Sequence, residues 1–192
     1  MATPRQIFQI YEGLYRNAET VRDFQIAQGE KVSGTVNLML KGDRAMLLSR
    51  WCDEMVELGE VLQGLHDDPY IVEATQCFYW ASLYTVTGGV SWDEIGFDEL
   101  RQQAAGSAAL SEVGLVLDQV ARIRELDPEQ VKPSKLFLLW WAMDKDYRHN
   151  PRFPQKRTIE EIMKYDLYDM QKRAYLKPII DEVLQGSPKG SP

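Results

Sequence analysis

The spacing of apolar residues predicts helices along nearly the whole chain. The first segment carries apolar side chains three and four positions apart: Ile7, Phe8, Tyr11, Leu14 and Tyr15. That spacing is helical, so we expect a helix over 4–27. Gly29 and the polar, β-leaning run 31–40 should interrupt it as a loop. Because strand-like residues are confined to 32–40, the expected fold class is all-α.

Two longer helices are expected in the centre of the chain, over 43–65 and 69–87. Asp43 is a suitable N-cap for the first, because its carboxylate can accept hydrogen bonds from free backbone N–H groups. Pro69 opens the second and Gly88-Gly89 ends it. Since the turn between them is short, the two helices should pack antiparallel, at the centre of a helical bundle.

Capping residues and prolines delimit the rest of the chain. Ser91 followed by Glu94 is a capping-box pattern that predicts a short helix. Three further helices are expected: 108–126, 133–148 and 158–184, the last kinked or split by Pro178. We therefore divide the chain into three parts: a helical domain over 1–148, a C-terminal helical extension over 149–185, and a Gly/Ser/Pro-rich tail over 186–192 that we expect to be disordered.

Composition and net charge limit the possible partners of the protein and its cellular compartment. The 192 residues can bury a sizeable core, and a net charge of −7 argues against nucleic acid or an anionic membrane surface as partner. Two cysteines and two histidines provide neither a disulfide framework nor a zinc-ligand spacing, which favours a reducing compartment. The longest apolar run, 137–143, is too short to span a bilayer, and no signal peptide is expected at the start. We expect a cytoplasmic protein.

Carboxylates on the two central helices are the candidate chemistry. Glu54 and Glu57 should lie together along one edge of the apolar stripe of the first helix, whereas Asp53 and Glu60 should lie nearer solvent. Glu73 is the only charged residue between Tyr70 and Thr87. An isolated carboxylate in an apolar helix carries a large desolvation cost unless it is paired, protonated or bound to metal.

An antiparallel arrangement would bring these side chains into one site. Gln76 lies one turn after Glu73 on the same helix face, so Glu54, Glu57, Glu73 and Gln76 can converge. Three carboxylates and an amide oxygen form a hard, oxygen-only site that suits Mg²⁺ or Mn²⁺.

The same residues resemble a family motif. The pattern Asp53-Glu54-x-x-Glu57, followed after a short turn by Glu73-x-x-Gln76, resembles the EExxE…ExxD motif of the MazG-like, all-α NTP pyrophosphohydrolases. Residues 57–60 resemble the ELGE run common after the first family motif, and 88–95 resemble the glycine turn and acidic helix start after the second. The resemblance covers 41–95. It departs from the family at Asp53, in place of glutamate, and at Gln76, in place of aspartate.

The resemblance implies a fold and a reaction. It implies a MazG-like bundle, a homodimer, and Mg²⁺ or Mn²⁺ held by Glu54, Glu57 and Glu73, with Gln76 in the fourth ligand position. The activity would be hydrolysis of a nucleoside triphosphate or related nucleotide to monophosphate and pyrophosphate, with Glu57 as the base that activates water. Because Gln76 is neutral, the site would carry one negative charge fewer than the family pattern.

Other interpretations remain open. Glu54 and Glu57 could be solvated carboxylates of an amphipathic helix, with Arg50 pairing Glu54 four residues away. A non-catalytic relative that binds a nucleotide or a protein is the alternative function, and a purely structural helical protein is a third. Trp140 and Trp141 should belong either to the core or to a dimer interface.

Overall fold

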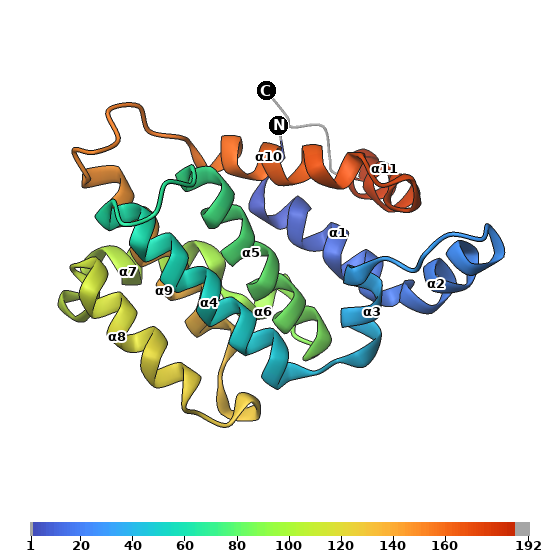
Figure 1. Cartoon of the computed structure of the whole chain (residues 1–192), viewed down its shortest axis with the longest axis horizontal. Helices are drawn as coiled ribbons and strands as arrows, with labels where there is room; N and C mark the ends of the chain where they lie inside the picture. The colour runs from blue at the N-terminus through green and yellow to red at the C-terminus, as the bar shows by residue number, and fades with distance from the viewer. Residues whose placement is uncertain (1, 187–192) are drawn as a thin grey trace. The chain divides into compact units, whose positions relative to one another are not determined.

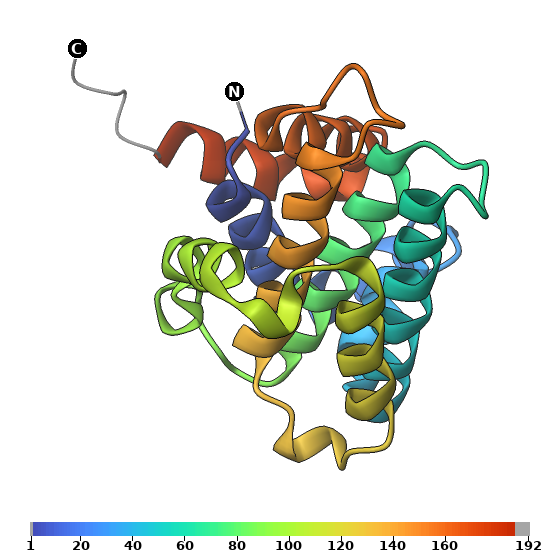
Figure 2. The same ribbon diagram turned by 90° about the vertical axis from the view of Figure 1, so that its left-hand side faces the viewer.

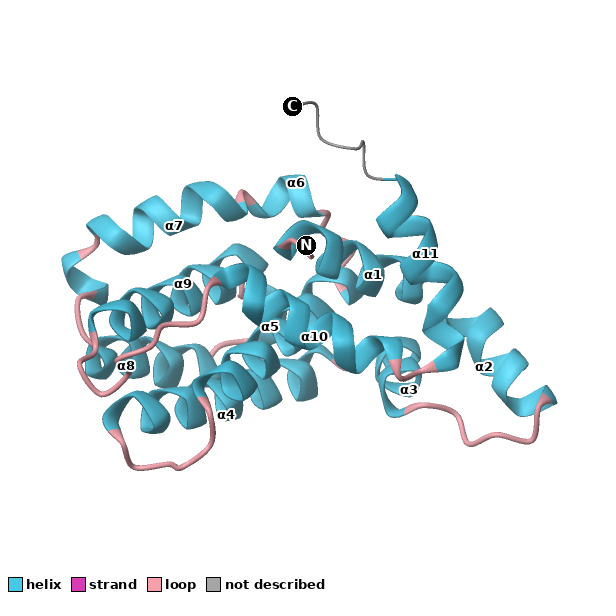
Figure 3. Cartoon of the chain, turned by 90° about the horizontal axis from the view of Figure 1, so that it is seen from above, coloured by secondary structure: helices cyan, strands magenta, loops and turns pink. Residues whose placement is uncertain are grey.

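A computed structural model describes residues 2–186, and every regular element within that range is a helix. Figure 3 accordingly shows helices and loops alone for this part of the chain. The all-α class is therefore confirmed for the described residues. No helix within this range is both long enough and apolar enough to cross a membrane.

The described residues form two compact units. The central unit comprises 43–158, and the terminal unit combines 2–42 with 159–186. The predicted boundary at 148/149, between a helical domain and a C-terminal helical extension, stays a prediction. The predicted tail, 186–192, lies outside the described residues from position 187 onward.

The central unit is built from six α-helices: α4 (Arg44–Gln63), α5 (Tyr70–Thr87), α6 (Trp92–Ile95), α7 (Phe97–Gly106), α8 (Val113–Arg124) and α9 (Pro133–His149). Helix α4 packs against α5 on one side and α8 on the other (Figures 1 and 2), and α9 packs against α5 and α7. Arg44 at the start of α4 donates a 2.9 Å hydrogen bond to the carbonyl of Tyr84 near the end of α5. The two helices therefore run antiparallel, as predicted.

Local capping explains where the central helices begin. The Asp43 carboxylate accepts a 3.0 Å hydrogen bond from the backbone N–H of Met46, which confirms the predicted N-cap of α4. Ser91 and Glu94 form the predicted capping box at the start of α6. The helix expected over 108–126 is shorter than predicted, because a 3₁₀ turn over Ala108–Leu110 precedes α8.

The core of the central unit is aromatic. Trp140 is fully buried and donates a 2.8 Å hydrogen bond from Nε1 to the carbonyl of Ala74, and Trp141 is 4% exposed and donates at 3.0 Å to the carbonyl of Phe97. Both indole N–H groups are thus satisfied within one chain. The core interpretation of these two tryptophans is confirmed, and neither ring offers a dimer surface.

The terminal unit is built from α1 (Pro4–Arg16), α2 (Ala18–Ala27), α3 (Gly34–Lys41), α10 (Ile159–Gln171) and α11 (Lys177–Gly186). Helix α1 contacts each of the other four. The hydroxyl of Tyr11 on α1 lies 3.0 Å from both carboxylate oxygens of the buried Asp166 on α10. This contact joins segments 155 residues apart in the chain.

Two predictions for the terminal unit were wrong, and a third was confirmed. The single helix expected over 4–27 breaks at Asn17, whose amide nitrogen donates to the carbonyl of Gly13 at 2.8 Å. The loop expected over 31–40 contains α3, which begins where the Ser33 hydroxyl caps the N–H of Val36. The predicted split of the last helix at Pro178 is confirmed. Helix α10 ends at Gln171, and Pro178 occupies the first turn of α11, where its missing N–H removes no intrahelical hydrogen bond.

Candidate metal centre

The antiparallel helix pair brings three of the four predicted ligands together. Glu54 and Glu57 lie one turn apart on α4, and Glu73 lies on the facing side of α5. One carboxylate oxygen from each of the three residues lies within 4.8 Å of the others. The convergence follows from the i, i+3 spacing on α4 and the antiparallel alignment with α5.

Two of these carboxylates are buried. Glu54 is 2% exposed and Glu73 is 1% exposed, whereas Glu57 is half-buried. Oε1 of Glu54 accepts hydrogen bonds from Trp80 Nε1 at 3.2 Å and from Arg50 at 3.0 Å. The Arg50–Glu54 pair predicted from the sequence therefore exists, but the burial of Glu54 rules out a simple solvated helix face.

The other buried oxygens lack partners. Oε2 of Glu54 and Oε2 of Glu73 form no hydrogen bond with any described residue. Buried polar atoms in native proteins nearly always have a partner, because an unsatisfied one carries its full desolvation cost. Two such oxygens in one cluster mark a position where a cation would satisfy both.

The electrostatics of the cluster disfavour three ionised carboxylates. Burial raises the pKa of Glu73 to about 7, and the neighbouring charges of Glu54 and Glu57 act in the same direction. Burial also raises the pKa of Glu54, with the charge of Glu57 adding to the effect and the Arg50 guanidinium opposing it. A divalent cation among these oxygens would offset both the desolvation and the mutual repulsion.

Gln76 is the fourth predicted ligand. It follows Glu73 by one turn of α5 and is half-buried. Its role as an amide-oxygen ligand stays a prediction. Compared with a carboxylate, the amide brings no negative charge to the cluster.

A groove between α4 and α8 adjoins the cluster. Its volume is about 620 Å³, and Glu57 is the one residue of the cluster on its wall. Gly59 allows the close approach of the two helices, because a Cβ at that position would lie 2.9 Å from Leu117 Cδ2. Asp53 and Glu60, which the sequence placed nearer solvent, are both half-buried and line this groove.

Two arginines on this groove form an ion-pair network. Arg124 of α8 contacts Asp53 at 2.8 Å, and Arg50 lies 3.7 Å from the other oxygen of the same carboxylate. Asp53 therefore holds two guanidinium groups beside Glu57. Sequence reasoning missed Arg124, which lies 71 residues from Asp53, and no local pattern links the two positions.

Comparison with protein-family models, with curated proteins and with solved structures finds no match to this chain.

Proposed function

We propose that the central unit is a metal-dependent nucleotide pyrophosphohydrolase of MazG-like type. The observation that carries the proposal is the cluster of Glu54, Glu57 and Glu73, with oxygens within 4.8 Å of one another and two of the three side chains almost fully buried. Mg²⁺ or Mn²⁺ fits this donor set, because both ions prefer oxygen ligands and carboxylates above all. Gln76 would supply a neutral fourth ligand.

The proposed substrate is a nucleoside triphosphate or a related nucleotide. Glu54, Glu57 and Glu73 would hold Mg²⁺, which would supply positive charge that offsets the charge of the substrate phosphates. Arg50 and Arg124 lie on the groove beside Glu57, so phosphates entering there would meet two guanidinium groups. The resemblance of residues 41–95 to the MazG-like motif favours cleavage between the α- and β-phosphates.

Glu57 is the proposed base. It is the only residue of the cluster that also lines the groove, so water can reach its carboxylate, whereas Glu54 and Glu73 are buried. Glu57 would accept a proton from the water that attacks the α-phosphorus. The bond from that phosphorus to the bridging oxygen breaks, and pyrophosphate leaves.

The family resemblance also supports a MazG-like arrangement of the bundle and a homodimer, and the absence of a disulfide framework favours a cytoplasmic location. These belong to the same proposal. Because Trp140 and Trp141 are buried within one chain, a dimer would use other surfaces. Analytical ultracentrifugation of the full chain tests the dimer. The molecular mass of a single chain at every protein concentration would contradict it.

Pyrophosphate release is the test of the activity. The full chain is incubated with ribo- and deoxyribonucleoside triphosphates and either Mg²⁺ or Mn²⁺, and pyrophosphate and monophosphate are measured. We expect at least one nucleotide to yield both products, and Glu57→Gln to lose the activity. Glu60→Gln is the matched control, because Glu60 lies three residues on along α4, lines the same groove and stands outside the cluster. Equal rates in the Glu57 variant and the wild type would contradict the proposal.

The alternative is a non-catalytic module that binds a nucleotide in the same groove. The neutral Gln76 favours it, because the cluster then holds one negative charge fewer than the family pattern. This alternative predicts that nucleotide with Mg²⁺ raises the melting temperature although no pyrophosphate is released.

A further inference from the structure

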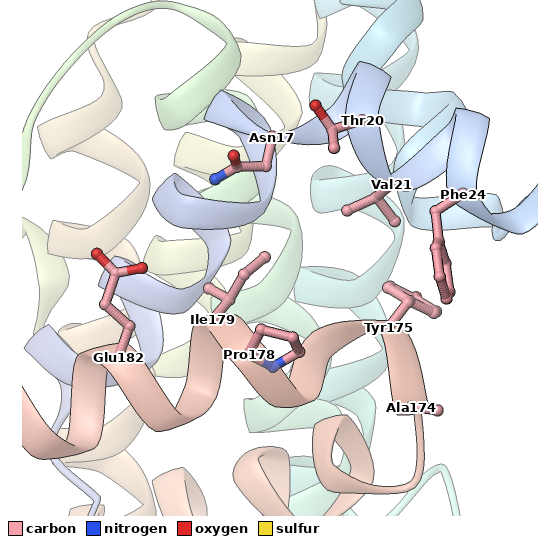
Figure 4. Close-up of a pocket in the computed structure, with 9 residues that line it drawn as sticks. All are labelled: Asn17, Thr20, Val21, Phe24, Ala174, Tyr175, Pro178, Ile179 and Glu182. Carbon is pink, nitrogen blue, oxygen red and sulfur yellow. The ribbon is translucent and has the colours of Figure 1, made fainter.

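The terminal unit contains a pocket of about 350 Å³ between α2 and α11 (Figure 4). Nine residues line it: Asn17, Thr20, Val21, Phe24, Ala174, Tyr175, Pro178, Ile179 and Glu182. The volume falls in the range of small-molecule sites. The carboxylate cluster of the central unit contributes no residue to the pocket, so a ligand could bind here whether or not the central unit hydrolyses nucleotides.

One end of the pocket is apolar and aromatic. Phe24 is 55% exposed although it belongs to the pocket wall, and Val21 and Ile179 form the buried surface beneath. Figure 4 shows the Phe24 and Tyr175 side chains on the right of the pocket and Ile179 and Pro178 below. An exposed phenyl ring beside buried aliphatic groups is a surface that an apolar ligand would remove from water.

The other end of the pocket presents hydrogen-bond acceptors. Glu182 is the only charged residue among the lining residues, and its carboxylate forms no ion pair within residues 2–186. The amide nitrogen of Asn17 donates to the carbonyl of Gly13 at 2.8 Å, so its amide oxygen is the group left for a ligand. Figure 4 shows Glu182 and Asn17 toward the left, away from Phe24.

The shape of the pocket is held by the fold. The Tyr175 hydroxyl donates a 2.9 Å hydrogen bond to Ser33 Oγ, and Ser33 in turn caps α3. Ile179 packs against Gly13 so closely that a Cβ at Gly13 would lie 2.8 Å from Ile179 Cγ2. A preformed site needs less ordering when a ligand binds.

We propose that this pocket binds a small organic amine with an aromatic or branched apolar body. The ammonium group has three N–H donors and no acceptor, which matches the Glu182 carboxylate and the Asn17 amide oxygen. Its charge complements Glu182, whereas an anionic ligand would be repelled. The apolar body fills the end formed by Val21, Phe24 and Tyr175, where an aromatic ring can pack edge-to-face or offset against Phe24.

Three probes of similar shape separate charge from apolar packing: 2-phenylethylamine, 2-phenylethanol and 3-phenylpropanoate. Binding to the full chain is measured by NMR, from ¹H–¹⁵N shifts of the residues that line the pocket. We expect the amine to bind best, the alcohol more weakly and the carboxylate not at all. An affinity in the millimolar range is sufficient for this measurement.

Two variants and a control complete the experiment. Glu182→Gln should weaken amine binding roughly fivefold without changing the binding of the alcohol, because an exposed ion pair contributes modestly. Phe24→Ala should weaken both. Asp181→Asn is the matched control, since Asp181 is an adjacent exposed acid on α11 that does not line the pocket. Equal affinity for amine and alcohol, an unchanged response in Glu182→Gln, or no amine binding at pocket residues would overturn the proposal.

Discussion

Replacing Glu73 with glutamine should stabilise the metal-free central unit at alkaline pH. The substitution keeps the shape of the side chain and removes its charge. Burial and the neighbouring Glu54 and Glu57 raise the pKa of Glu73 from its ordinary value of 4.5 to about 7. At about 1.4 kcal/mol for each tenfold change, that rise corresponds to about 3 kcal/mol of folding free energy.

The sign of this effect depends on pH. Because the folded pKa lies above the unfolded one, the native state binds the Glu73 proton more tightly than the unfolded state does. Ionisation of Glu73 therefore costs the central unit no stability below about pH 4.5. The loss of stability grows as the pH rises and is complete above about pH 7. Glutamine does not titrate, so the advantage of Glu73→Gln should be absent near pH 4.5 and reach about 3 kcal/mol near pH 8.

Tryptophan fluorescence during urea unfolding measures this difference. All five tryptophans lie between 51 and 141, so the signal reports on the central unit. With chelator present, Glu73→Gln should be more stable than wild type at pH 8 and similar at pH 5. Millimolar Mg²⁺ should then raise the stability of the wild type and leave the variant unchanged, because only a site with all three carboxylates holds the ion. Destabilisation of the variant at both pH values, or equal responses to Mg²⁺, would refute the reasoning.

Three further substitutions have definite expected outcomes. Gln76→Asp should tighten Mg²⁺ binding roughly tenfold, measured by calorimetry, because it adds a charged ligand; an unchanged affinity would remove Gln76 from the site. Burial raises the pKa of Asp166 to about 7, so the terminal unit should lose stability between about pH 4 and pH 7. Asp166→Asn should abolish this slope of stability against pH, as measured by amide hydrogen exchange of α1 and α10. A slope that persisted would assign it to another group. Gly13→Ala places a Cβ 2.8 Å from Ile179 Cγ2 and should destabilise the terminal unit by about 1–3 kcal/mol, measured by the same hydrogen exchange. Unchanged exchange would show that Ile179 moves freely.

The central helix pair was predictable because its signals are local. Asp43 at one end of α4 and the glycines after Thr87 mark helix termini within a few residues of sequence. The i, i+3 spacing of Glu54 and Glu57 likewise determines which face of α4 they share. The isolation of Glu73 in an apolar helix indicated the burial that the structure shows.

The remaining features depend on contacts between distant segments or on weak local signals. Helix α3 begins within the β-leaning run 31–40, and its helical conformation comes from the Ser33 cap and from burial of Val36 and Met39 on one face. Helix α7 was not predicted because its apolar positions are few. Pairing of α1 with α10 through Tyr11 and Asp166 spans most of the chain, so no local pattern indicates it.

Manganese binding to the full chain tests the metal centre most directly. Free Mn²⁺ has a sharp electron paramagnetic resonance signal, so its loss on addition of protein measures binding without any substrate. We expect saturable binding at neutral to alkaline pH that weakens toward pH 5, as protons occupy Glu73. Glu54→Gln and Glu73→Gln should abolish it, while Glu60→Gln should bind as the wild type does. Absence of Mn²⁺ binding to the wild type at pH 8, or equal binding by all four proteins, would contradict a metal centre at Glu54, Glu57 and Glu73.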